Sequence, residues 1–148
     1  PGQAMPLFTG DDFKRFIEQA TWICVNDYES QLLQDRTGWS PHEIAGKVEA
    51  LIVTRGGEGS HVYLDDKRLD IPTAPVSGIV DPTGCGDAFR GGVLYGLMND
   101  LDWETTGRIA ALMGAIKIEQ HGTQNHSFTL DDFRQRYQAA FGEALSAL

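Results

Sequence analysis

The sequence predicts an α/β fold in which a largely parallel sheet is flanked by helices. Short apolar runs that end in turn residues alternate along the chain with segments whose apolar residues recur at helical spacing, and this alternation is typical of layered α/β folds. The length of 148 residues is close to that of one domain, and the composition, 41% hydrophobic and 22% charged, is that of a globular protein. We therefore expect one continuous domain over 1–148.

The first half of the chain contains the clearest strand signals. Thr9 and Asp12 form a helix-capping pattern, which is followed by apolar residues at helical spacing. The apolar runs at 22–25 and 51–54 stop at turn residues, so each indicates a buried strand. In order, the expected elements are a helix over 10–20, a strand at 22–25, a short helix from about Glu29, a helix from Ser40 to about Glu49 and a strand at 51–54.

The second half is expected to add a hairpin, a short strand and three helices. Two alternating segments joined by charged residues suit a β-hairpin, and after them the apolar spacing becomes helical. In order, we expect a hairpin from segments 60–64 and 68–71, a short strand at 76–80, a helix from Gly86, a helix over 103–119 and a helix capped by Thr129.

Charge, cysteine content and hydropathy exclude several classes of function. With 12 Lys and Arg against 21 Asp and Glu, the net charge of −9 repels nucleic acids and anionic membranes. Cys24 and Cys85 are too few for a disulfide framework, and no apolar run is long enough to span a bilayer. The first residues lack the basic and apolar regions of a secretory signal, so we expect a cytoplasmic protein.

The segment 81–92, DPTGCGDAFRGG, contains the residues best suited to chemistry. Its glycines precede a predicted helix, so the backbone N–H groups of Gly84, Cys85 and Gly86 are expected to converge on an anion. Asp87 would repel a bound phosphate, but it suits a site where a hydroxyl must lose a proton to attack phosphorus. For GCGD alone, a turn with Asp87 as the helix cap is the alternative. Neither a dinucleotide-binding glycine pattern nor a P-loop is present.

This segment resembles the second signature of the ribokinase-like (PfkB) carbohydrate kinases, a loop of the type Asp-Thr-x-Gly-Ala-Gly-Asp. Cys85 departs from the usual Ala, but such a loop acts through its main-chain N–H groups. The resemblance implies that Asp87 is the catalytic base and that the amides of 84–86 hold the developing charge. The residues that fit the signature are Asp81, Thr83, Gly84, Gly86 and Asp87, with Pro82 as an accepted variant.

Two segments that follow predicted strands also resemble elements of this family. Asn26 and Glu29 match an Asn-x-x-Glu element, which implies that Glu29 organises Mg²⁺ through water and that Asn26 lies near the phosphates. Taken alone, this pair would be read as a strand-end turn. Arg55 occupies a position that is commonly apolar, so we expect its side chain to point to solvent. The residues that match a Thr-x-Gly-x-x-Gly loop along the nucleotide are Thr54, Gly56 and Gly59.

The resemblance continues beyond the long predicted helix. Segment 122–124 matches the loop that closes over the adenine, and Ala110 and Met113 would then line the adenine pocket. Asp81 and Thr83, together with carbonyl groups after the long helix, are implied to bind a monovalent cation such as K⁺.

The resemblance implies an ATP-dependent phosphotransferase that acts on the hydroxymethyl group of a sugar or nucleoside, with Mg²⁺ and K⁺ as cofactors. Within the family, the motifs look most like an adenosine-kinase-like branch. The chain is similar to the C-terminal, nucleotide-binding half of a ribokinase-like fold, because the N-terminal sugar-binding strands and the lid have no counterpart in it. The expected partners are ATP, the acceptor, and either the N-terminal half or a second copy in a homodimer. The alternative is a nucleotide-binding module without turnover, and we expect the isolated chain to be inactive.

Overall fold

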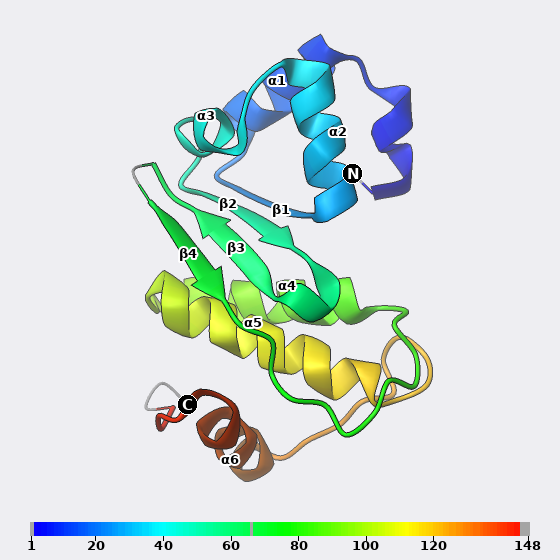
Figure 1. Cartoon of the computed structure of the whole chain (residues 1–148), viewed down its shortest axis with the longest axis vertical. Helices are drawn as coiled ribbons and strands as arrows, with labels where there is room; N and C mark the ends of the chain where they lie inside the picture. Colours follow the sequence, from blue (N-terminus) through cyan, green and yellow to red (C-terminus); the bar gives the residue numbers. More distant parts are fainter. Residues whose placement is uncertain (1, 66, 146–148) are drawn as a thin grey trace. The chain divides into compact units, whose positions relative to one another are not determined.

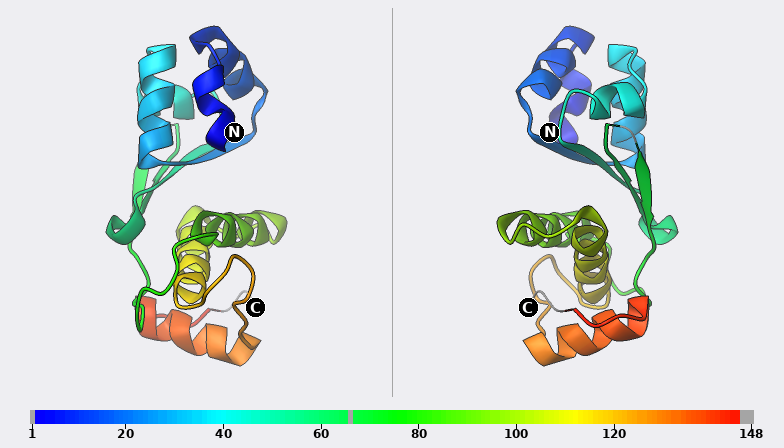
Figure 2. Two further views of the ribbon diagram at one scale, coloured as in Figure 1. Left: turned by 90° about the vertical axis from the view of Figure 1, so that its right-hand side faces the viewer. Right: turned by 90° about the vertical axis from the view of Figure 1, so that its left-hand side faces the viewer.

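The computed structural model describes residues 2–65 and 67–145 and confirms an α/β fold (Figure 1). The chain divides into two compact units, residues 1–70 and 71–148. Helices pack beside a sheet in the first unit, and the second unit is built from helices (Figure 2).

A sheet of four strands in the order β1-β2-β3-β4 organises the first unit. β1 runs parallel to β2, with Asn26 opposite Thr54, whereas β2 and β3 are antiparallel. The sheet is therefore mixed, and the expectation of a largely parallel sheet was wrong. The physical reason is the short connection between β2 and β3, since a parallel pair needs a long crossover. The strands are β1 (Trp22–Asn26), β2 (Ala50–Thr54), β3 (Ser60–Tyr63) and β4 (Arg68–Ile71).

The α-helices α1, α2 and α3 of the first unit begin at capping boxes, in which a side chain at each end of the first turn accepts a backbone N–H. α3 ends at Ala45, earlier than the expected Glu49, because the Glu49 N–H donates to the Thr21 carbonyl (2.9 Å) and leads the chain into β2. The helices are η1 (Gly2–Leu7), α1 (Gly10–Gln19), α2 (Asp27–Thr37), α3 (Pro41–Ala45) and the short η2 (Gly56–Glu58). Their shared core includes Met5, Phe13, Ile17, Val25, Leu33, Ile44 and Leu51.

Three helices form the second unit: α4 (Cys85–Met98), α5 (Trp103–Ile118) and α6 (Leu130–Phe141). α4 and α5 lie side by side in opposite directions (Figure 1). Glycine permits their close approach, because a Cβ atom on Gly92 would lie 2.5 Å from the Ala110 Cα. α6 packs on α5 through a core that includes Leu112, Ile116, Phe133 and Tyr137.

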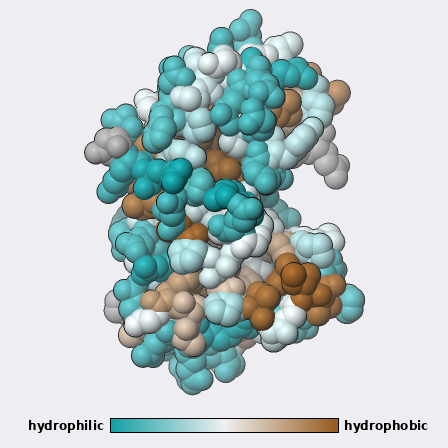
Figure 3. Space-filling model, in the orientation of Figure 1, coloured by the Kyte–Doolittle hydropathy of each residue, from teal (hydrophilic) through white to brown (hydrophobic). Residues whose placement is uncertain are grey.

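The segment 76–80 is not a strand, which corrects the expectation from the sequence. The N–H groups of Val80 and Asp81 both donate to the Ile118 carbonyl, at 2.9 and 3.1 Å, so the end of α5 takes the hydrogen bonds that a neighbouring strand would otherwise take. Val76, Ile79 and Val80 are exposed, and Figure 3 shows a hydrophobic area on the side of the second unit where this segment runs.

No helix in the described part of the chain is both long enough and apolar enough to cross a membrane.

Candidate active site

The loop that leads into α4 contains the predicted anion-binding residues, and Gly84 fixes its shape. Gly84 is the N-cap residue of α4 and has a φ of 86°, in the left-handed region that favours glycine. A Cβ atom at this position would also lie 3.1 Å from the Thr123 Cα and carbonyl oxygen. The 122–124 segment therefore lies against the loop.

The backbone amides of the loop are not equivalent. The Cys85 N–H donates to the Pro82 carbonyl at 3.1 Å, which leaves it engaged within the turn. Across the residues that the structure describes, the N–H groups of Gly84 and Gly86 have no protein acceptor. Because both belong to the first turn of α4 or its cap, they remain available to an anion at the helix N-terminus.

Asp87 is the third residue of α4 and is not its cap. The Gly84 carbonyl accepts the Asp87 N–H at 3.1 Å, and the α4 cap has no side-chain hydrogen bond. The interpretation of Asp87 as a helix cap was therefore wrong. Its carboxylate is 82% exposed and accepts a hydrogen bond from the Arg90 guanidinium at 3.0 Å. This ion pair orients the carboxylate at the mouth of the loop.

Asp81 ties the start of the loop to the segment after α5. One carboxylate oxygen accepts the Thr83 N–H at 2.9 Å, and the other accepts the Gly122 N–H at 2.8 Å. Hydrogen bonds from Thr83 and Gly122 favour the ionised form and lower the pKa of Asp81 to about 2. The carboxylate thus acts as a fixed acceptor that holds two loops together.

The low pKa makes Asp81 a source of acid sensitivity. Its ionised form stabilises the folded state above the ordinary pKa of 3.8, and this stabilisation is lost as the pH falls towards the folded-state pKa of about 2. We expect the melting temperature, followed by circular dichroism, to fall more steeply with pH in this interval for the wild type than for Asp81→Asn. Asp65→Asn removes an exposed hairpin carboxylate as a control, and its curve should follow the wild type. Parallel curves for all three proteins would contradict this assignment.

Cys85 does not have the surroundings of a reactive thiol. Burial raises the pKa of its thiol, and its Sγ lies 3.9 Å from the Asp81 carbonyl oxygen, an acceptor that favours the protonated form. Cys85 therefore serves the loop as a small side chain, as its place in the signature implied.

The predicted phosphate and magnesium residues, Asn26 and Glu29, form a capping box at the start of α2. The Asn26 side chain accepts the Glu29 N–H at 2.7 Å, and the Glu29 carboxylate accepts the Asn26 N–H at 3.0 Å through Oε2. Asn26 and its partner Thr54 lie at the carboxyl ends of two parallel strands, an edge where α/β proteins bind ligands. Glu29 belongs to no cluster of metal-ligating side chains in the described chain.

The loop after β2 has the turn geometry that its glycines predict. Gly56 and Gly59 have φ angles of 55° and 86°, and the Arg55 N–H donates to the Gly59 carbonyl at 2.8 Å. The Arg55 side chain does not simply point to solvent, which corrects the expectation. It forms an ion pair with Glu58 and lies 2.8 Å from His61 Nε2. Burial, with nearby Arg68 and Arg55, lowers the pKa of His61.

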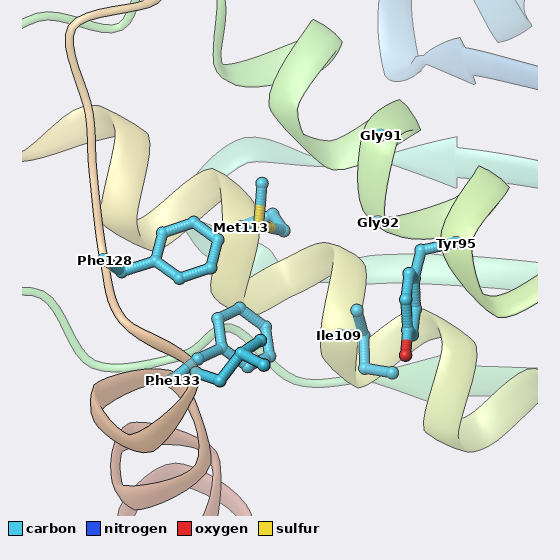
Figure 4. Close-up of a pocket in the computed structure, with 8 residues that line it drawn as sticks. Gly91, Gly92, Tyr95, Ile109, Met113, Phe128 and Phe133 are labelled. Carbon is cyan, nitrogen blue, oxygen red and sulfur yellow. The ribbon is translucent and has the colours of Figure 1, made fainter. Parts of the chain in front are cut away.

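An apolar pocket of about 280 Å³ lies within the second unit (Figure 4). Met113 and Phe128 face each other across it, and Tyr95 closes it on the α4 side. Ala110, the second residue predicted to contact the base, is fully buried beneath Gly92 and does not line the pocket. Of the two residues predicted to contact the base, Met113 therefore lines this pocket and Ala110 does not.

Sequence reasoning missed two side chains at this site. Arg90 follows Asp87 by three residues, a spacing that places both on one helix face, so the signal was available. Lys117 is fully buried at the end of α5 and donates to the Asp81 carbonyl at 2.7 Å. Nothing in the local pattern around Lys117 indicates a buried ammonium group.

Comparison with known proteins places the chain among kinases. The model of the pfkB family carbohydrate kinases matches residues 3–130. The chain is 30% identical over 138 residues to the nucleoside kinase of Methanocaldococcus jannaschii and 31% identical over 135 residues to that of Thermoplasma acidophilum. These matches take in 93% and 91% of this chain, but 46% and 44% of the relatives. The chain thus spans about half the length of the curated relatives it matches.

Solved structures agree with the sequence matches. The nucleoside kinase of Burkholderia thailandensis in complex with inosine is 50% identical, with a TM-score of 0.94 over 98% of this chain and 49% of that one. The M. jannaschii nucleoside kinase, described as an archaeal member of the ribokinase family, is 30% identical, with a TM-score of 0.89 over 94% of this chain and 46% of that one. Since the family match extends over most of its residues, the chain belongs to the PfkB family of carbohydrate kinases and has a ribokinase-like fold.

Proposed function

We propose that this chain is the nucleotide-binding portion of a kinase that transfers the γ-phosphoryl group of ATP to the hydroxymethyl group of a purine nucleoside. The observation that carries the proposal is the start of α4, where the amides of Gly84 and Gly86 and the carboxylate of Asp87 occupy one helix end. One helix end thereby combines N–H donors for a phosphoryl group with a base for a hydroxyl group.

The residues at the start of α4 have two roles in this proposal, proton acceptance and charge stabilisation. Asp87 accepts the proton of the acceptor hydroxyl as its oxygen approaches phosphorus. The Gly84 and Gly86 amides, at the positive end of the α4 dipole, stabilise the negative charge that develops on the transferred group. Arg90 holds the Asp87 carboxylate at 3.0 Å, so that the base is oriented before the acceptor arrives.

The nucleotide is bound as a magnesium complex in this proposal. Mg²⁺ bridges phosphate oxygens and offsets their charge. Glu29 would hold the ion through water, since its Oε2 already accepts the Asn26 N–H and no cluster of ligating side chains surrounds it in the described chain. The family resemblance assigns Thr54, Gly56 and Gly59 to the loop along the nucleotide.

A purine nucleoside is the acceptor that the comparisons support best. Relatives that match more than nine-tenths of this chain are nucleoside kinases, and the B. thailandensis enzyme was solved with inosine and with ADP-inosine. We include adenosine with inosine in the class, because the two share the ribose hydroxymethyl group on which the chemistry acts.

Nucleotide binding can be tested on this chain directly. A ligand present at about 100 times its dissociation constant stabilises the folded state by roughly 2.7 kcal/mol, so Mg-ADP should raise the melting temperature. Thr54→Val keeps the size of a strand residue but removes the hydroxyl, and we expect it to weaken the shift. An unchanged melting temperature at millimolar Mg-ADP would contradict the proposed donor site.

Phosphoryl transfer is tested on the longest natural protein that contains this chain. ADP release should depend on added inosine or adenosine, because phosphoryl transfer depends on an acceptor positioned in line with the γ-phosphorus. Ribose and fructose serve as comparison acceptors. Turnover with the sugars and none with either nucleoside would overturn the assignment of the acceptor class while leaving the kinase assignment intact.

A further inference from the structure

Among the described residues of the second unit, Lys117 is a buried charged side chain that the proposed chemistry does not use. It lies in the last turn of α5 with no exposed surface, although lysine is almost never fully buried unless its charge has partners. Its Nζ donates to the Asp81 carbonyl at 2.7 Å and to the Gln120 carbonyl at 3.0 Å. Both hydrogen-bond acceptors are therefore neutral main-chain oxygens, each from a different loop.

These two carbonyls belong to the segments at which the family resemblance implied a monovalent cation. Converging main-chain carbonyls are the ligands by which proteins hold K⁺. The Asp81 carboxylate is already engaged in holding the two loops, because one of its oxygens accepts the Thr83 N–H and the other the Gly122 N–H. The residues present thus do not fit an added K⁺, since the ammonium group of Lys117 already takes the oxygens.

We propose that Lys117 replaces the monovalent cation with a tethered ammonium group, so that the active-site loop is held in place by the chain itself. An ammonium group and K⁺ each present one positive charge to surrounding oxygens, and Lys117 brings three N–H donors. The consequence for the proposed kinase is that neither nucleotide binding nor transfer depends on K⁺.

Lys117 is a positioning residue, because it touches the loop and not the reacting atoms. Lys117 holds the carbonyl of Asp81, which lies three residues before Gly84. The Asp81 N–H donates to the Ile118 carbonyl, and the Asp81 carboxylate accepts the Gly122 N–H. Removal of the ammonium group would take from the Gln120 carbonyl its side-chain donor and leave the Asp81 carbonyl with only the weak thiol donor of Cys85. Buried unpaired acceptors are destabilising, and the Gly84 loop would lose its anchor.

The first test uses the unaltered protein. Melting temperature and Mg-ADP affinity are measured in KCl, NaCl and tetramethylammonium chloride at equal ionic strength, and we expect the same values in all three salts. A melting temperature or an ADP affinity that rises specifically with K⁺ would overturn the proposal. The melting temperature reports on Lys117 even if Mg-ADP does not bind, so failure of this inference is distinguishable from failure of the proposed function.

The second test removes the ammonium group. Lys117→Met keeps the length of the stem, and we expect a melting temperature lower by ~5 °C or more in tetramethylammonium chloride. K⁺ or NH₄⁺ should restore part of the loss, because either ion fits between the two carbonyls and tetramethylammonium does not. Lys67→Met, which changes an exposed lysine of the hairpin, should show neither the loss nor the response.

A residue with only a structural role would lower the melting temperature equally in every salt. A folded Lys117→Met chain without a response to K⁺ or NH₄⁺ would therefore contradict the proposal. If Lys117→Met does not fold, Lys117→Gln is used in its place, because it retains one donor group and still removes the charge. If neither variant folds, the salt comparison on the unaltered protein decides.

Discussion

Asp87→Asn should lower kcat by about 10²–10⁴-fold in the longest natural protein that contains this chain, with little change in the affinity for Mg-ADP. The amide keeps the shape of the side chain but cannot accept a proton from the acceptor hydroxyl. Nucleotide affinity is preserved because the phosphates are held by backbone N–H groups of the loop and not by this carboxylate. Steady-state kinetics with inosine, together with ADP titration, separate the two quantities.

The chain contains a matched control for this substitution. Asp131 lies in the first turn of α6, is 84% exposed and pairs with Arg134 three residues later at 3.2 Å, as Asp87 pairs with Arg90 at 3.0 Å. Asp131→Asn therefore makes the same chemical change in a similar helical setting. We expect its kcat to equal that of the wild type, and a comparable loss in both variants would show that Asp87 has no special role.

Gly92→Ala should destabilise the second unit by about 1–3 kcal/mol, the usual range for an overpacked core. The new Cβ atom would lie 2.5 Å from the Ala110 Cα and 2.8 Å from its nitrogen. Both are backbone atoms of α5, so the clash is relieved only if the two helices move apart. Thermal and urea unfolding of the chain measure the loss.

The neighbouring glycine provides the opposite expectation. Gly91 is exposed, and a Cβ atom there would meet no other atom within 4 Å. Gly91→Ala should raise the free energy of unfolding by roughly 0.5–1 kcal/mol, because alanine restricts the unfolded chain and favours helix. Equal changes in the free energy of unfolding for the two substitutions would show that α4 and α5 do not pack as closely as the Gly92–Ala110 distances indicate.

Local patterns were sufficient to predict most elements of the fold. The capping pairs Thr9–Asp12 and Ser40–Glu43 mark the starts of α1 and α3 because a cap is a contact within one turn. The same reasoning failed where a distant residue decides the outcome. The segment 76–80 has the composition of a strand, yet its end is bound to Ile118, and no local signal indicates that partner.

In the candidate site, too, sequence patterns predicted some features and missed others. The family signature pointed to Gly84 and Asp87, since the left-handed turn before α4 needs glycine and the signature has a carboxylate three residues later. It gave no information on the Cys85 N–H, which Pro82 engages, because main-chain hydrogen bonds depend on backbone angles and not on side-chain identity. The role of Lys117 was not predicted for a different reason. Its hydrogen-bond acceptors are main-chain carbonyl oxygens, which every residue type supplies.

The loop after β2 in the first unit also affects the rate at which a nucleotide would associate. Its backbone is closed by the bond from the Arg55 N–H to the Gly59 carbonyl, and the Arg55 side chain is held by Glu58 and His61. A loop with one fixed conformation loses little entropy when a ligand arrives, and the encounter awaits no rearrangement. We therefore expect a nucleotide to associate with this loop without a slow rearrangement of the loop backbone.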